Sequence, residues 1–232
     1  MKKITIAIFM LLSYFSIASA ELGINIGVSA QLGIMEGSGS EGSTAVASER
    51  ETSETKETLF AMGSYFAELE LGFLPGPLKR ITLGYDNIAH DLDLGTQRNQ
   101  RVTANLMDKA TGTETLKDHS LNAKITGFET VYATLNITDW LYLKAGNVDV
   151  DVKTKFSGTS TTKYKTNHSL DGTVVGFGLH KKTDNGMFFR LEYNDYEIDG
   201  KSVKNTGADT KFTAVLNETT GSTGRISIGK AF

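Results

Sequence analysis

The chain has 232 residues, of which 39% are hydrophobic, and its 24 basic side chains are set against 27 acidic ones. This length supports one large or two small domains with a sizeable core. The sequence contains no cysteine, which excludes disulfide frameworks, thiolate metal sites and cysteine nucleophiles, and the slight acidic excess argues against a nucleic-acid-binding protein.

The first twenty residues predict a secretory signal peptide. Lys2 and Lys3 precede a nearly apolar run over residues 4–17, and residues 18–20, Ala-Ser-Ala, form a small-residue cleavage site. An N-terminal membrane anchor is the alternative, but the apolar run is shorter than the roughly 20 residues that span a bilayer as a helix. We therefore expect a signal peptide over residues 1–20 and one exported domain over residues 21–232.

The exported domain is dominated by an alternation of apolar and polar residues. Successive side chains of a strand point to opposite faces, so the apolar even positions from Leu22 to Ile34 predict a strand with one apolar face. Its length exceeds the usual soluble strand of about 5–6 residues and suits the roughly 9–11 tilted residues that cross a bilayer. The same alternation predicts seven further strands, over residues 59–71, 80–86, 130–136, 141–152, 175–180, 189–194 and 225–232.

The alternation changes phase within the fifth of these strands. The apolar residues move from odd to even positions between Ala145 and Val148. A β-bulge inserts one extra residue into a strand and so exchanges its two faces. We therefore expect a bulge near Asn147.

The connectors between the strands alternate in length. Four long connectors alternate with three short ones: residues 35–57, 74–77, 91–119, 138–139, 154–168, 182–186 and 200–220. This pattern is typical of an outer-membrane barrel, with long loops outside and short turns in the periplasm. Because a spanning segment must satisfy its backbone polar groups internally, spanning strands have to close into a barrel. We predict an all-β fold, an eight-stranded antiparallel up-and-down transmembrane β-barrel with both mature termini in the periplasm.

A soluble β-sandwich or a lipocalin-like barrel is the alternative fold. In either one the apolar faces would turn inward. Strands of this length are unusual in sandwiches, and the alternation of long and short connectors is harder to explain in a soluble protein. The sequence therefore favours lipid as the neighbour of the apolar faces.

The last strand carries a resemblance to a known family. Residues 224–232, Gly-Arg-Ile-Ser-Ile-Gly-Lys-Ala-Phe, resemble the final strand of Gram-negative outer-membrane β-barrel proteins, although Ser227 and Lys230 depart from the usual pattern. Residues 188–193, Phe-Phe-Arg-Leu-Glu-Tyr, resemble the penultimate strand of small OmpA-like and opacity-like barrels. The resemblance implies a porin-like protein of the outer membrane, with Phe232 as the signal that the barrel-assembly machinery recognises.

Charged residues on the polar faces of the strands are expected to point into the barrel. There are seven of them, of both signs: Glu68, Glu70, Arg80, Lys144, Arg190, Glu192 and Arg225. Because charges in a narrow lumen are costly unless they are paired, we predict a salt-bridge network that fills the barrel. The alternative is a gate whose ion pairs exchange partners and open a narrow pore.

Aromatic residues mark the strand ends at the predicted short turns. Phe73, Trp140, Phe189 and Phe232 suit a girdle at the level of the lipid headgroups. At the opposite end, residues 35–57 are rich in Gly, Ser, Thr and Glu, a composition that predicts a mobile loop.

The sequence shows no assembled catalytic or metal-binding pattern. The four histidines, His90, His119, His168 and His180, lack the spacing of metal ligands, and no cysteine accompanies them. His119 and His168 each precede a serine, but adjacent side chains on a strand point apart and do not easily form a nucleophile–base pair. We expect no cofactor, no metal and no enzyme activity; a lipid A-modifying enzyme is the least favoured alternative.

Together these features predict a non-enzymatic outer-membrane barrel. Its role would be structural, or surface binding through four long extracellular loops, and a narrow porin-like pore for small solutes is the alternative. Expected partners are outer-membrane lipid and lipopolysaccharide, whose phosphates Lys155, Lys163 and Lys165 could meet as point charges. We expect a monomer that does not bind nucleic acid.

Overall fold

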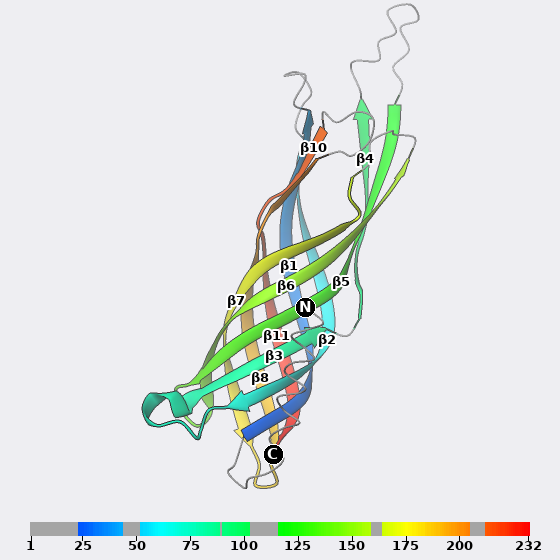
Figure 1. Cartoon of the computed structure of the whole chain (residues 1–232). Coiled ribbons are helices and arrows are strands. Elements are labelled where there is room, and N and C mark those ends of the chain that lie inside the picture. The colour runs from blue at the N-terminus through cyan, green and yellow to red at the C-terminus, as the bar shows by residue number, and fades with distance from the viewer. Residues whose placement is uncertain (1–22, 44–51, 89, 103–115, 159–163, 205–211) are drawn as a thin grey trace, which may run out of the picture.

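The computed structural model describes residues 23–43, 52–88, 90–102, 116–158, 164–204 and 212–232, and the strands among them form one continuous sheet (Figure 1). The strands are β1 (Gly23–Ser43), β2 (Thr52–Glu70), β3 (Ile81–Ile88), β4 (Leu92–Val102), β5 (Leu116–Asn136), β6 (Leu141–Gly158), β7 (Asn167–Lys182), β8 (Met187–Ile198), β9 (Lys201–Lys204), β10 (Phe212–Leu216) and β11 (Thr219–Ala231). A short 3-10 helix, η1 (Gly76–Arg80), joins β2 to β3. No helix in these ranges is both long and apolar enough to cross a membrane. The predicted signal peptide lies outside the described residues.

Eight of the described strands close into a barrel. In the order β1, β2, β3, β5, β6, β7, β8 and β11, each strand pairs antiparallel with the next. The last strand returns to the first, since β11 pairs with β1 from Asn25↔Ala231 to Glu36↔Thr220. The predicted fold class, an eight-stranded antiparallel up-and-down barrel, is therefore confirmed.

The strands extend far beyond their predicted limits at one end of the barrel. β1 and β2 stay paired up to Glu41↔Thr52, and β5 and β6 stay paired up to His119↔Gly158. β4 continues along β5 beyond β3, and β10 continues along β1 beyond β11 (Figure 1). Much of the predicted loops is therefore strand. The backbone pairing between neighbouring strands continues past the region where one face of each strand is apolar, so the alternation of apolar residues does not mark the strand ends. The remaining connectors, residues 44–51, 103–115, 159–163 and 205–211, lie outside the described residues.

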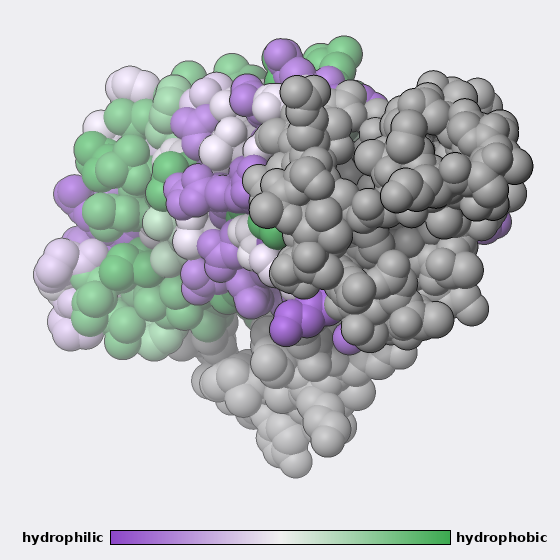
Figure 2. Space-filling model, turned by 90° about the horizontal axis from the view of Figure 1, so that it is seen from above, coloured by the Kyte–Doolittle hydropathy of each residue, from purple (hydrophilic) through white to green (hydrophobic). Residues whose placement is uncertain are grey.

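The outward side chains of the barrel form an apolar belt. Large aliphatic residues on five of its strands are more than half exposed: Leu32 57%, Val131 57%, Val175 57%, Leu191 55% and Ile226 62%. Seen from above, hydrophobic residues gather on the outer perimeter of the visible wall, and hydrophilic ones lie nearer its middle (Figure 2). A continuous exposed apolar surface of this kind suits lipid and not water.

Polar residues replace the apolar ones along the same outward face beyond the belt. On the side where the strands extend, the outward positions carry carboxylates: Glu36, Glu57, Glu129, Asp149, Asp171 and Asp195. The belt therefore has a defined edge, past which the wall of the barrel presents a surface suited to water.

The predicted bulge at Asn147 is wrong. β6 pairs with β5 and β7 without a break through Asn147, and the described register shift in the β5–β6 ladder lies between Ile125 and Gly127. Val148 and Val150 point into the barrel, where they are 2% and 1% exposed. The apolar residues exchange faces because the surroundings change: past the belt the outer surface is polar, and the interior becomes the apolar side.

An apolar cluster fills the barrel interior at this level. Its members come from both sides of the lumen: Met35, Phe60, Met62, Ile88, Ile125, Phe128, Val148, Val150, Leu170, Val174, Tyr196 and Ile198. The rings of Phe128 and Tyr196 meet edge to face, with their centroids 5.7 Å apart. This part of the barrel has a core of the kind found in soluble proteins, and the core obstructs the lumen.

Candidate functional site

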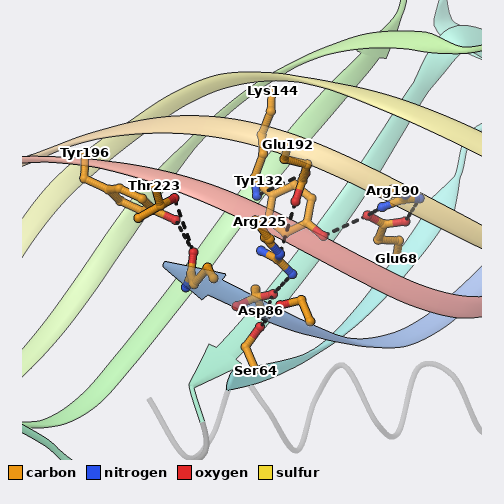
Figure 3. A network of polar contacts seen from close by, with 12 residues as sticks. Ser64, Glu68, Asp86, Tyr132, Lys144, Arg190, Glu192, Tyr196, Thr223 and Arg225 are labelled. Atoms are coloured by element: carbon orange, nitrogen blue, oxygen red, sulfur yellow. Dashed lines mark hydrogen bonds and ion pairs between the residues drawn. The ribbon is translucent and has the colours of Figure 1, made fainter. Parts of the chain in front are cut away.

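The candidate site is the polar interior of the barrel at the level of the apolar belt. Seven of the eight barrel strands place a polar side chain there: Asn25 (β1), Glu68 (β2), Asp86 (β3), Tyr132 (β5), Lys144 (β6), Glu192 (β8) and Arg225 (β11). Each of these residues is at most 5% exposed. The strand alternation turns these side chains inward, as Figure 3 shows for most of them.

Glu68 and Arg190 form the first part of the network. The Arg190 guanidinium meets the Glu68 carboxylate with two nitrogens: Nη1 contacts Oε1, and Nη2 donates to Oε2 at 2.6 Å. Tyr132 donates its hydroxyl to Oε1 at 2.8 Å, and Asn25 Nδ2 donates to Oε2 at 3.2 Å. The Arg190 guanidinium also lies 4.6 Å from the centre of the Phe188 ring. A bidentate pair held by further donors is the geometry in which a buried ion pair is best compensated.

Arg225 joins two carboxylates in the second part of the network. Its Nη2 contacts Asp86 Oδ2, and its Nε lies 3.1 Å from Glu192 Oε2. Lys144 Nζ approaches the other oxygen of Glu192 at 3.6 Å, and Ser64 donates to Asp86 at 3.0 Å. Arg225 is therefore the central cation of this half, with a buried anion on each side.

The deep charges balance. Three carboxylates, Glu68, Asp86 and Glu192, stand against three cations, Lys144, Arg190 and Arg225, each in at least one ion pair. Because every charge is engaged by another, the network is suited to holding strands together.

Glycines on inward positions make room for the aromatic rings of this interior. Gly84 lies directly opposite Tyr132 across β3 and β5, and Gly178 lies opposite Tyr142 across β7 and β6. A Cβ atom at either glycine would collide with the ring of its partner. Two further pairs follow the same rule: Gly27 with Phe66, and Gly229 with Phe188.

The structure places the seven charged residues expected in the lumen as follows. Glu68, Lys144, Arg190, Glu192 and Arg225 lie in the ion-pair network. Glu70 lies at the edge of it and accepts a hydrogen bond from Asn25 Nδ2 at 2.9 Å. Arg80 is exposed at the end of η1 and makes no ion pair with a described carboxylate.

Asp86 is the network residue that sequence reasoning missed. It follows Thr82 and Gly84 on the inward positions of β3, and both Thr82 and Asp86 are buried. The alternation within this strand could have identified it as an inward charge.

The predicted girdle residues lie at the end with the short turns. Of the four histidines, His180 lies on β7 near the same end, His119 and His168 lie on the extended parts of β5 and β7, and His90 lies in the connector between β3 and β4. Phe73, Trp140, Phe189 and Phe232 are all more than half exposed. His180 Nε2 lies 2.7 Å from the Asp139 carbonyl, a contact that ties β7 to the β5–β6 turn. Within the residues that the structure describes, no group of three potential ligands could hold a metal ion.

Comparison with known proteins finds similarity of fold only. No protein-family model matches the chain, and no curated protein sequence matches it. Among solved structures, it resembles the outer-membrane protease OmpT of Escherichia coli at 10% identity and a TM-score of 0.49, covering 94% of this chain and 99% of that one. It also resembles OprG of Pseudomonas aeruginosa (10%, TM-score 0.43, 91% and 97% covered) and the attachment invasion locus protein Ail of Yersinia pestis (11%, 0.33, 88% and 98%). At these values the similarities do not bear on activity, and the barrel fold rests on the strand pairing itself.

Proposed function

We propose that the chain is a non-enzymatic β-barrel of the bacterial outer membrane with a structural or surface-binding role. The observation that supports this role most directly is the obstructed lumen. The ion-pair network fills one level of the barrel and the apolar cluster fills the next. A barrel of eight strands has an interior that side chains can fill, so the wall and the strands beyond it are the surfaces left for function.

The belt and the strand extensions give the proposed barrel its orientation. The apolar belt would contact lipid, and the paired extensions of β1 with β2 and of β5 with β6 would project from the outer surface. Lys155 and Lys165 are exposed at this end, where phosphates of lipopolysaccharide would be within reach; Lys163 lies outside the described residues. The termini and short turns would then face the periplasm.

The final strand fits recognition by an assembly machinery that reads a terminal aromatic residue. Phe232 is 69% exposed, while its backbone N–H donates to the Ile24 carbonyl at 2.9 Å. Its ring is therefore displayed on the outside of a wall that its backbone helps to close.

A non-enzymatic role is also supported by the polar contacts. Among the side chains that the structure describes, which do not include those of His119 and Ser120, no serine or threonine hydroxyl is hydrogen-bonded to a histidine ring. His180 contacts a backbone carbonyl, and Ser169 donates to Asp149 at 3.4 Å. The nucleophile–base pair that acyl transfer requires is not assembled among these groups.

Conductance in planar lipid bilayers tests the proposed role against a pore. We expect the wild-type barrel to give no ion channels, because both levels of the lumen are filled. Arg190→Ala and Glu70→Ala should be equally silent, since the apolar cluster beyond them stays in place. Folded barrel in each sample is verified by heat-modifiable mobility in gels. Discrete channels in the wild type, altered by either substitution, would replace the proposal with a narrow gated pore.

A further inference from the structure

At the outer end of the barrel, β2 has one edge without a partner strand. β1 pairs with β2 over its whole length, from Glu70 to Thr52, but β3 pairs with it only between Ser64 and Glu70. β4, which continues β3, pairs with β5 instead (Figure 1). Among the described strands, none pairs with this edge over residues 52–63, so alternate backbone N–H and C=O groups of β2 face away from the sheet.

Other strand edges at this end carry features that hinder the addition of a further strand. The pairing of β4 with β5 has a register shift between Asp93 and Thr96, and β9 has only four residues. β6 is met by a following segment, since Thr154 N–H donates to the Thr166 carbonyl at 2.8 Å. Bulges, short strands and covering segments protect sheet edges. β2 contains no proline, and its pairing with β1 has no register shift, so its edge can accept another strand.

The open edge carries charges that can select a partner. Lys56 and Glu57 are exposed, and among the described residues neither makes an ion pair. On its paired side, Glu57 lies directly opposite Glu36 of β1, and like charges in this position repel. A cation opposite Glu57 on an added strand would offset this repulsion. Leu59, which is 68% exposed on the same face, would favour an apolar neighbour.

We propose that this edge binds an extended segment of a partner protein, which adds to β2 as an antiparallel strand. Backbone hydrogen bonds would supply the affinity, and alternate side chains the selectivity. Because directly opposite residues share a face, the segment would place an apolar residue opposite Leu59, a basic one opposite Glu57 and an acidic one opposite Lys56. This inference rests on the surface-binding role proposed above and names the kind of partner.

The test uses the full mature protein folded in detergent micelles and a synthetic peptide, Thr-Val-Thr-Lys-Glu-Val-Thr, blocked at both ends. Aligned antiparallel to residues 54–60, the peptide places its lysine opposite Glu57 and its glutamate opposite Lys56. Amide hydrogen exchange along β2 is followed by NMR. We expect alternate amides of residues 54–60 to exchange fast in the free protein and to slow when the peptide saturates the edge, with no change along strands that are paired on both sides.

A peptide with the lysine and glutamate exchanged separates recognition of the edge from general attraction, because its composition and net charge are the same. It should bind at least about fivefold more weakly, the order expected when two opposite-charge pairs become like-charge pairs. The double variant Lys56→Glu/Glu57→Lys should invert this preference. Both side chains are exposed, so the variant is expected to fold.

Two further peptides, each methylated on alternate backbone nitrogens, test the backbone pairing. Only the peptide whose methyl groups lie on the edge toward β2 should lose binding. The proposal is overturned if this edge of β2 is already protected without peptide, by this chain or by a second copy. It is also overturned if the original peptide does not bind, if the exchanged peptide binds equally well, or if the two methylated peptides behave alike. Such a result, with a barrel that gives no channels in planar bilayers, would leave the proposed function in place.

Discussion

Arg225→Ala is expected to lower the free energy of unfolding by about 3–5 kcal/mol, the cost of leaving a buried ion pair without one partner. Arg225 is 3% exposed and stands between Asp86 and Glu192. Among the contacts of the described residues, its removal leaves Asp86 with the Ser64 hydroxyl and leaves Glu192 with Lys144 at 3.6 Å. The loss arises from two buried carboxylates that no longer have adequate compensation.

Urea titration of the barrel in lipid vesicles measures this loss. The chain has a single tryptophan, Trp140, whose fluorescence reports folding. Two controls accompany it: Lys153→Ala, an exposed cation that should change stability little, and the double variant Arg225→Ala/Asp86→Asn. The double variant should recover part of the loss, because it neutralises the carboxylate left without a cation and keeps the Lys144–Glu192 pair. A loss below about 1 kcal/mol for Arg225→Ala would mean that the network does not stabilise the barrel.

Ile226→Arg is expected to destabilise the folded barrel in a bilayer by about 2–4 kcal/mol, the cost of an arginine on the lipid face near the midplane. Ile226 is 62% exposed within the apolar belt. Thr220→Arg is the matched control, because Thr220 points outward on the same strand beyond the belt. Near the interface the cost falls to about 0–1 kcal/mol.

The same vesicle titration, run on both arginine variants, gives the comparison. The two variants should differ strongly in their free energy of unfolding only if the environment of β11 changes between Thr220 and Ile226. Equal effects at the two positions would contradict a lipid-facing belt. A repeat in detergent micelles, whose apolar layer adapts to the protein, should reduce the cost at Ile226.

The sequence predicted the part of the barrel whose outer surface is apolar. Where the outer surface is apolar, one face of every strand must be apolar and the other polar, so strands such as residues 22–34 and 225–232 could be located from alternation alone. The strand number and up-and-down order followed from the lengths of the connectors. Both predictions depend on local pattern, which a single sequence displays.

The change at residues 145–148 could not be resolved from pattern alone. A bulge and a change of surroundings both shift apolar residues from one face to the other, and only the unbroken pairing through Asn147 distinguishes them. Past the belt the apolar residues turn inward, and Val148 and Val150 join the apolar cluster. One chain thus uses both patterns in succession.

The partners within the ion pairs could not be predicted from the sequence either. Arg190 meets a carboxylate 122 residues away, and Arg225 meets one 139 residues away, because the barrel brings strands that are not neighbours in the sheet across the lumen. Arg80 stands at a position where the alternation predicts an inward side chain. However, the chain leaves the sheet before Gly76, whose φ of 69° suits glycine, and β3 begins only at Ile81. Arg80 therefore does not lie on a strand.

Site-directed spin labelling along β11 tests most directly whether lipid surrounds the belt. The chain has no cysteine, so single-cysteine variants at Thr220, Ile226, Ser227 and Ile228 each carry one label in an otherwise unchanged protein. In vesicles, labels at Ile226 and Ile228 should be relaxed by oxygen and shielded from a water-soluble nickel chelate, with the reverse at Thr220 and little access by either at the inward position Ser227. Free access of the nickel chelate to Ile226 and Ile228 would contradict the account.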